Sequence, residues 1–315
     1  MRLVRGIANL RASPRGCAVT IGTYDGLHLG HRALIERLRA HGAGGARATM
    51  MITFEPTPRE YMAPTDPPAR LTSWRERWRL LSRTSLDYLL LLRFGESLRS
   101  MPGEEFAQLL SRDLAAAVVV VGHDFRFGRH GEATAPMLVQ AGARLGFAVD
   151  VVPPVTIDGE RVSSSHIRAA LARGDLRQAE RWLGRRYSMC GRVVRGERLG
   201  RKLGFATANL RLERRRSPLD GIFAARVHGV GSAARAAVAS LGTRPTVNGV
   251  EPLLEVHLFD FDGDLYGKHL SVELMAYLRP EMKFESTDAL KAQMSKDCAE
   301  ARRILPALAD RRLRN

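Results

Sequence analysis

Residues 17–38 read CAVTIGTYDGLHLGHRALIERL, and this stretch decides the fold of the first part of the chain. Its first five residues are apolar or β-branched, which predicts a buried strand. A turn containing glycine and aspartate follows, and apolar residues then recur at helical spacing from Leu29 onward. A strand that passes through a turn into a helix is the repeating unit of a parallel sheet with helices packed on its faces.

The same alternation of strand and helix continues to about residue 183. Four more apolar segments predict strands: ATMMITF (48–54), DYLLLLRF (87–94), AAVVVVG (116–122) and FAVDVVP (147–153). Apolar residues at helical spacing predict the helices: LGHRALIERLRAHG (29–42), SWRERWRLLSRT (73–84), GEEFAQLLSRDL (103–114) and PMLVQAGARLG (136–146). We therefore predict a Rossmann-like α/β domain with a parallel sheet, whose ligands bind at the carboxyl ends of the strands.

The pattern changes in the second part of the chain. Residues 166–184 predict two short helices, broken at Arg173–Asp175. Five short strands are then predicted: SMCGRVVRG (188–196), FAARVHGV (223–230), AAVASLG (236–242), LLEVHLFDF (253–261) and HLSVELMAYL (269–278). Residues 286–305 predict a terminal helix with Ser286 as its N-cap. This pattern is typical of a small antiparallel β-barrel, so we predict two domains, 1–183 and 184–315.

Composition indicates a globular protein outside the membrane. Of the 315 residues, 45% are hydrophobic and 26% charged, which excludes a disordered chain. The longest apolar run, Leu114–Val121, is far shorter than the ~20 residues that cross a bilayer. The first ten residues lack the apolar core of a secretory signal. Cys17, Cys190 and Cys298 lie far apart without metal-type spacing, which fits a reducing, cytoplasmic location.

The net charge of +16 suggests nucleic acid at first sight. Only five of the 49 basic residues are lysines, however, and alanine and glycine are abundant, which indicates a codon bias. We therefore expect no nucleic-acid partner, and a basic nucleic-acid-binding protein is kept as an alternative.

The turn after the first strand carries a candidate phosphate site. His28 and His31 are three residues apart, so they share one face of the first helical turn. Gly22 ends the strand, and Gly30 removes a side chain where a ligand would approach the backbone. Two imidazoles at the positive end of a helix suit phosphate oxygens whose charge grows during transfer.

The string HLGH resembles the HxGH signature of the nucleotidyltransferase superfamily, and a second element of that superfamily follows. RVSSSHIRAAL (161–171) resembles its ISSTxxR element. Ser163, Ser164 and Ser165 lead into a helix start, where hydroxyl and backbone N–H groups can hold phosphate, and Arg168 adds a charged fork. The resemblance implies transfer of a nucleoside monophosphate from a nucleoside triphosphate to a phosphate-bearing acceptor, with release of pyrophosphate.

Two loops indicate which phosphate-bearing acceptor the first domain uses. FEPTPREY (54–61) and VGHDFRFG (121–128) follow predicted strands, and together they resemble the FMN-adenylylating module of the prokaryotic riboflavin kinase/FAD synthetase family. Prolines there would stiffen a wall for a flat ring, and aromatic side chains would offer apolar faces, although core packing explains the aromatics equally well. The implied flavin-binding residues are Phe54, Pro56, Pro58, Asp124, Phe125 and Phe127.

The second domain carries an independent candidate site. GRVVRGERLGRKLGFATANL (191–210) is a basic loop in which Gly200 and Gly204 let backbone amides approach phosphates. Thr207 and Asn209 can present two oxygen ligands, a donor type that Mg²⁺ favours. The end of the string resembles the PTAN motif of flavokinases, which holds Mg²⁺ and ATP phosphates, with Ala206 in place of the family's proline.

The same resemblance implies the general base of the kinase. SLGTRPTVNG (240–249) resembles the family's NIGxRPT segment, with Ser240 in place of asparagine. LEVHLFDFDGDLYGKHL (254–270) matches the strand that carries the base, which falls on Glu255. A carboxylate there would accept the proton of riboflavin's 5′-hydroxyl. Taken alone, Glu255 and His257 could equally be solvated residues of one strand face.

The motifs together imply a bifunctional enzyme of flavin cofactor biosynthesis. We expect the second domain to convert riboflavin and ATP into FMN and ADP. The first domain would convert FMN and a second ATP into FAD and pyrophosphate. Three alternatives stay open: an FMN adenylyltransferase with a degenerate kinase domain, an enzyme that adenylylates another phosphate ester, and the nucleic-acid-binding protein. The sequence does not set the oligomeric state.

Overall fold

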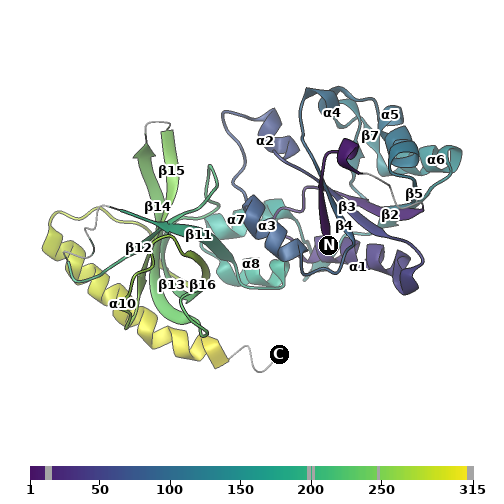
Figure 1. Ribbon diagram of the computed structural model, residues 1–315. Coiled ribbons are helices and arrows are strands. Elements are labelled where there is room, and N and C mark those ends of the chain that lie inside the picture. The colour runs from purple at the N-terminus through teal and green to yellow at the C-terminus, as the bar shows by residue number, and fades with distance from the viewer. Residues whose placement is uncertain (11–15, 197–199, 201–202, 247–248, 311–315) are drawn as a thin grey trace. The chain divides into compact units, whose positions relative to one another are not determined.

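The strand predicted at the start of the chain lies near the centre of a six-stranded parallel sheet. A computed structural model of the chain shows this sheet (Figure 1). The structure describes residues 1–315 except 11–15, 197–199, 201–202, 247–248 and 311–315. The sheet order is β1 (Arg2–Arg5), β4 (Tyr88–Leu92), β3 (Thr49–Phe54), β2 (Cys17–Ile21), β5 (Ala116–Gly122) and β8 (Ala148–Val152). Every neighbouring pair is parallel, which confirms the predicted sheet.

Four of the helices described in this part of the chain lie close to their predicted positions, whereas two short helices, Pro58–Met62 and Glu96–Ser100, were not predicted. They are α1 (Leu29–His41), α2 (Pro58–Met62), α3 (Trp74–Leu81), α4 (Glu96–Ser100), α5 (Gly103–Gln108) with a π-helical turn (Leu109–Asp113), and α6 (Ala135–Leu145). Short 3₁₀ turns lie at Ile7–Asn9, Ala43–Gly45 and Arg129–Gly131. Two small antiparallel sheets accompany the main sheet: β6 (Arg126–Phe127) pairs with β7 (Ala133–Thr134), and β9 (Thr156–Ile157) pairs with β10 (Glu160–Arg161). The edge strand β1 was not predicted, because arginines at both of its ends hide the apolar pattern.

The central strands of the sheet are buried on both faces, and their residues are apolar or β-branched. All five residues of β2 are buried, since both faces of a parallel sheet are covered. Cys17, Val19 and Ile21 pack in one cluster with Phe106 of α5 and Leu138 of α6. Helix α1 contacts β2, β3, β5 and β8. The rigid sheet thereby holds the loops that follow β2, β3 and β5.

The second part of the chain forms a closed antiparallel barrel, as predicted. Its order is β11 (Ser188–Val194), β12 (Ala208–Arg211), β15 (Gly249–Leu258), β14 (Arg235–Thr246), β13 (Gly221–His228) and β16 (His269–Arg279). Leu254, Val256 and Leu258 of β15 are buried, and they alternate with Glu255 and His257. Strand β12 was not among the predicted strands, although an extended segment was expected at Thr207 and Asn209.

Helix α10 (Thr287–Asp310) lies along the barrel (Figure 1) and contacts β13, β14 and β16. Its predicted cap is present, because the Ser286 hydroxyl accepts a hydrogen bond from the Ala289 N–H at 3.1 Å. Ala301 and Leu305 pack on Phe259 and Met275 of the barrel. Among the described residues, no helix is long and apolar enough to span a membrane.

The chain divides into two compact units. We call residues 1–68 and 77–163 the N-terminal unit, and residues 69–76 and 164–315 the barrel unit. The two predicted short helices, α7 (Ser164–Ala172) and α8 (Leu176–Leu183), belong to the barrel unit because α8 packs on β16 and buries Trp182. Compactness therefore groups residues 164–183 with the barrel, although the sequence pattern placed them with the sheet.

Candidate active sites

The first candidate site lies at the carboxyl end of β2, where the sheet order reverses. The chain proceeds from β2 to β3 on one side and reaches β5 on the other side, which makes this end a topological switch point. Val19 and its neighbours on β2 are locked in the core, so the loop 22–28 begins from a fixed strand end. The structure thus places the HLGH string where open α/β sheets bind ligands.

The two histidines of this string form one stacked pair. The rings of His28 and His31 lie 3.6 Å apart between centroids, with an interplanar angle of 18°. His28 is buried and is the N-cap of α1, because its Nδ1 accepts a hydrogen bond from the His31 N–H at 3.3 Å. An accepting Nδ1 places the proton of the neutral ring on Nε2. On the neutral His28 ring, Nε2 is therefore the donor nitrogen.

Small residues and Tyr24 fix the position of this pair. A Cβ on Gly30 would lie 3.2 Å from two ring atoms of His28, so a side chain there would displace the imidazole. A Cβ on Gly22 would lie 3.2 Å from the ring of Tyr24, which in turn lies 5.1 Å from the His31 ring. Burial raises the pKa of Tyr24 far above its ordinary value, although a hydrogen bond with Thr20 acts in the opposite direction. Tyr24 is therefore a neutral support for His31.

The second predicted phosphate element starts beside the first. The same Cβ on Gly30 would lie 3.6 Å from the carbonyl oxygen of Val162, directly before Ser163. Ser164, Ser165 and Arg168 lie in α7 and are described with the barrel unit. There the Arg168 Nε–H donates to the carbonyl of Ala69 at 2.6 Å.

The predicted flavin loops follow β3 and β5 in the N-terminal unit. Phe54 ends β3 and makes an edge contact with Phe94, and Pro58 is the first residue of α2. Phe125 is half-buried and stacks on Phe127, at 5.6 Å between ring centroids. Phe127 itself is buried in the core, so Phe54 and Phe125 are the predicted aromatics with accessible surface.

Asp124 in the second of these loops forms an ion pair with Arg161. Partial burial alone would raise the pKa of Asp124. The hydrogen bond and positive charge of Arg161, with a smaller contribution from His123, hold that pKa below its ordinary value. The carboxylate is therefore charged at neutral pH and engaged with arginine.

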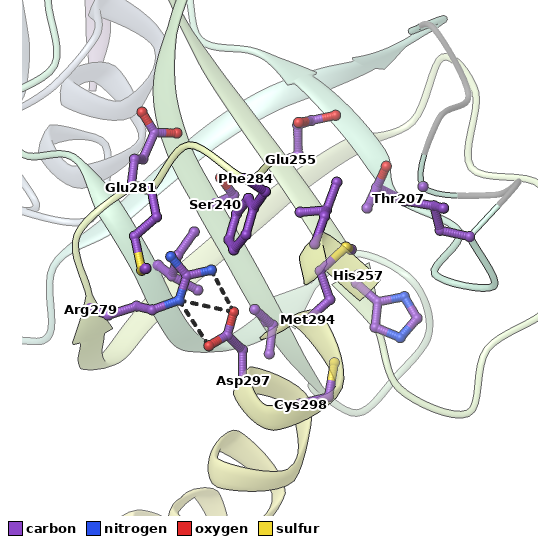
Figure 2. A pocket seen from close by; sticks show the side chains of 16 residues that line it. Thr207, Ser240, Glu255, His257, Arg279, Glu281, Phe284, Met294, Asp297 and Cys298 are labelled. Carbon is purple, nitrogen blue, oxygen red and sulfur yellow. Dashed lines mark hydrogen bonds and ion pairs between the residues drawn. The ribbon is translucent and has the colours of Figure 1, made fainter. Parts of the chain in front are cut away.

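The second candidate site is a cavity of about 350 Å³ between the barrel wall and α10. Apolar and polar side chains share its lining, and Figure 2 shows how they converge from neighbouring strands and the helix. Its lining residues are Gly200, Leu203, Thr207, Ile222, Val238, Ser240, Glu255, His257, Arg279, Glu281, Met282, Phe284, Leu290, Met294, Asp297 and Cys298.

Strand register brings the predicted base together with its neighbours. Glu255 lies directly opposite Asn209 of β12 on one side and Ser240 of β14 on the other. Opposite residues of antiparallel strands have their Cβ atoms ~5 Å apart on the same face. The predicted metal ligand Asn209 and the predicted base therefore share one face of the barrel wall.

A second cavity of about 340 Å³ lies on the other side of Thr207. Its lining residues are Val193, Ala206, Thr207, Ala208, Leu258, Phe261, Asp262, Gly263, Asp264, Leu265 and Tyr266. Thr207 lines both cavities.

Of the two glycines of the predicted phosphate loop, Gly200 packs closely on this segment and Gly204 has open space around it. A Cβ on Gly200 would clash with the Phe205 carbonyl oxygen and would lie 3.2 Å from Thr207 Oγ1. Gly204 has a φ of +89°, which side-chain-bearing residues rarely adopt. Residues 197–199 and 201–202 of the loop, and residues 247–248 of the NIGxRPT-like segment, lie outside the described residues.

Several residues of the cavity were not predicted. The Arg279 guanidinium binds both carboxylate oxygens of Asp297 on α10, at 2.8–3.2 Å, and thereby ties the helix to the barrel. Phe284, Leu290 and Met294 add an apolar wall that suits a flat ring. The signal available in the sequence was the run RPEMKF (279–284), where charge and an aromatic residue directly follow the last strand.

Glu281 is a second carboxylate in this cavity. Burial and the nearby Asp220 carboxylate raise its pKa above the ordinary value, although Arg279 and a hydrogen bond with Ser240 act in the opposite direction. Burial also raises the pKa of the Cys298 thiol to about 11, so the thiol is protonated at neutral pH. Ser240 therefore lies beside both carboxylates, Glu281 and Glu255.

His257 holds the segment in which Ala206 replaces the family's proline. Its Nδ1–H donates to the Ala206 carbonyl at 3.0 Å. The resemblance assigns this segment to ATP, and on that assignment we expect His257→Phe, which keeps a ring and removes the donor, to raise the KM for ATP about fivefold. That is the effect of one lost hydrogen bond of ~1 kcal/mol. Initial rates at varied ATP concentration measure it, and an unchanged KM would contradict this role of His257.

Comparison with known proteins places the chain in a family. A family model described as FAD synthetase matches residues 10–166, and one described as riboflavin kinase matches residues 183–305. A protein of Escherichia coli (strain K12), named bifunctional riboflavin kinase/FMN adenylyltransferase, is 43% identical over 96% of this chain and 97% of its own. A Pseudomonas fluorescens protein of the same name is 42% identical over 99% of this chain and 100% of its own.

A solved structure matches the fold over the same span. It is described as a macrolide-efflux protein from Streptococcus pneumoniae, and it has a TM-score of 0.81 at 29% identity. The match covers 95% of this chain and 98% of that chain. Two family models in series, and relatives matched from end to end at 42–43% identity, show that the chain belongs to the family of bifunctional riboflavin kinase/FMN adenylyltransferases.

Proposed function

We propose that the chain phosphorylates riboflavin in its barrel and adenylylates the resulting FMN at the HLGH site. The observation that carries the kinase assignment is the pair of cavities that meet at Thr207, with Glu255 lining one of them. We further propose that the functional division follows the sequence boundary, with residues 1–183 for adenylylation and 184–315 for the kinase. The matches of the two family models to residues 10–166 and 183–305 support this division.

In the kinase reaction, riboflavin would occupy the cavity beside α10 and ATP the cavity on the other side of Thr207. The apolar wall of Phe284, Leu290 and Met294 suits the flavin ring, which leaves the ribityl chain to reach Glu255. Glu255 accepts the proton of the 5′-hydroxyl as its oxygen bonds to the γ-phosphorus. The bond from that phosphorus to the β-phosphate oxygen breaks, and ADP leaves.

The same wall of the barrel carries a donor set that fits a magnesium ion. The Thr207 hydroxyl and the Asn209 carboxamide are hard, neutral oxygen donors on one short segment, and Mg²⁺ completes its shell with phosphate oxygens and water. Bound there, the ion would neutralise charge on the transferred phosphate. Thr207 and Asn209 orient the phosphates toward Glu255, which lies opposite Asn209.

Thr207→Val keeps the shape of the side chain and removes the oxygen donor. We expect it to raise the Mg²⁺ concentration for half-maximal riboflavin kinase rate about tenfold, a loss of ~1.4 kcal/mol that is typical of a contact to a charged group. Adenylylation of FMN by the same preparation should be unchanged. A magnesium titration with the wild-type kinase curve would contradict the assignment of Thr207.

In the adenylylation reaction, the loops after β3 and β5 would hold FMN, and HLGH would hold ATP. An FMN phosphate oxygen attacks the α-phosphorus of ATP. The bond from that phosphorus to the oxygen that bridges it to the β-phosphorus breaks, and pyrophosphate leaves. His28, through its Nε2, and His31 stabilise the charge that develops on the phosphate oxygens. Ser163, Ser164, Ser165 and Arg168 complete the phosphate contacts in this proposal, while Phe54, Pro56, Pro58, Asp124 and Phe125 border the flavin. We place the enzyme in the cytoplasm.

The decisive experiment separates the products formed from riboflavin, ATP and Mg²⁺ by chromatography, beside a reaction that starts from FMN. Both FMN and FAD are expected from riboflavin, and FAD is expected from FMN. FAD from FMN alone would indicate a degenerate kinase. With neither product, under oxidised or reduced conditions, other adenylylation acceptors would be tested next.

A further inference from the structure

Arg77 is the largest side chain that the N-terminal unit buries completely, with a relative exposure of 1%. It lies in α3, outside every motif that the sequence suggested. A buried guanidinium is costly unless its N–H groups are bonded and its charge is matched. Its partners therefore indicate what this arginine is for.

Those partners lie in two different loops of the candidate adenylylation site. Arg77 Nη1 donates to the carbonyl of Thr23 at 2.7 Å. Nη2 forms an ion pair with the Glu55 carboxylate at 2.6 Å and also donates to the Phe54 carbonyl at 3.3 Å. One cation thus links the loop after β2 to the loop after β3.

This link lies beyond the last pair of residues that the sheet itself connects. The ladder between β2 and β3 ends with Ile21 opposite Ile52. Past that pair, the Arg77 bonds and a long hydrogen bond of 3.4 Å from the Thr53 hydroxyl to the Thr23 carbonyl connect the two loops. The guanidinium carries donors on two nitrogens in a rigid fork, so it can set a distance that a single lysine ammonium cannot.

Each linked loop leads directly into residues assigned to one substrate. Thr23 precedes Tyr24, whose ring lies 5.1 Å from that of His31. Glu55 precedes Pro56 and α2, on the side assigned to the flavin. The distance between the two loops therefore sets the distance between the two substrates.

We propose that Arg77 is a positioning residue that sets the alignment of the FMN phosphate with the α-phosphorus of ATP. The inference rests on the proposed function, because it takes one loop to serve ATP and the other FMN. Since each substrate is held mainly by its own loop, loss of Arg77 leaves both substrates bound and disturbs their mutual geometry. A displacement of ~1 Å can lower a transfer rate ~100-fold.

The test compares Arg77→Met and Arg77→Lys with the wild-type enzyme in the full chain. We expect Arg77→Met to lower kcat for FMN adenylylation at least ~30-fold, while the Kd values for FMN and ATP change less than about threefold. The kcat of Arg77→Lys should lie between those of Arg77→Met and the wild-type enzyme. The riboflavin kinase rate of each preparation reports whether the barrel is intact. Arg79→Met, which changes an exposed arginine of the same helix, is the matched control.

The outcomes separate positioning from plain structural support. A kcat within threefold of wild type for Arg77→Met overturns the proposal. Parallel losses of kcat, both affinities and thermal stability also overturn it, because they mark a residue that only supports the fold. If Arg77→Met does not fold, Arg77→Lys decides, with a kcat loss of at least fivefold at unchanged Kd values expected. An active His28→Ala enzyme would instead contradict the assigned adenylylation site itself.

Discussion

Glu255→Gln is expected to lower the rate of riboflavin phosphorylation about 10³-fold, in the range that a positioned general base contributes. Glutamine has nearly the same shape and can still accept a hydrogen bond, but it cannot take the proton of the 5′-hydroxyl. The neighbours Asn209 and Ser240 stay opposite it, so riboflavin binding should change little. Chromatography of FMN formed from riboflavin, with ATP and Mg²⁺ saturating, measures the effect on kcat.

Two comparisons make this result specific. Adenylylation of FMN by Glu255→Gln should equal that of wild type, which shows that the chain is folded. Glu251→Gln, an exposed carboxylate on the same strand β15, should keep the kinase rate. A kinase rate within tenfold of wild type in Glu255→Gln would remove Glu255 from the role of base and direct attention to Glu281, the cavity carboxylate that is not paired with Arg279 as Asp297 is.

His28→Ala is expected to lower FMN adenylylation about 10³-fold, because a preorganised donor to a developing phosphate charge typically contributes 10²–10³. The substitution also removes the N-cap of α1, a loss of ~1 kcal/mol of stability. Riboflavin phosphorylation by the same preparation should continue and FMN should accumulate. The ratio of FAD to FMN after a timed reaction measures the effect.

His28→Asn separates the two roles of this histidine. Asparagine is a good N-cap, so it should restore the stability of α1 without restoring an imidazole. We expect its adenylylation rate to stay as low as that of His28→Ala. If His28→Asn recovers the wild-type rate, His28 acts only as a cap, and His31 would become the candidate for phosphate contact.

Much of the fold follows from local pattern. The buried run Cys17–Ile21 and the helical spacing after Leu29 predict β2 and α1, and both are present at those positions. The alternation of Leu254, Glu255 and Val256 likewise predicts a strand with one buried face. Such features are readable because burial along one element repeats with the period of that element. Edge strand β1 lacked this signal.

The residues of the candidate sites were predicted, but their arrangement in space was not. HLGH, Thr207, Asn209 and Glu255 could be named from residue type, spacing and family resemblance. That Glu255 lies between Asn209 and Ser240 depends on the register of three strands, and that Thr207 lies between two cavities depends on barrel closure. Register and closure depend on packing between residues that are distant in sequence. The local pattern of apolar residues carries no information about that packing.

Other assignments were decided only by tertiary packing. Phe127 was a predicted flavin contact with core packing as the alternative, and its ring is buried in the core. Arg77 belongs to no motif of the sequence, yet it is completely buried and bonded to Thr23 and Glu55. The sequence alone therefore sufficed for the order of elements and the chemistry of the motifs. Which side chains meet was left to the tertiary structure, because a side chain's surroundings depend on every element packed around it.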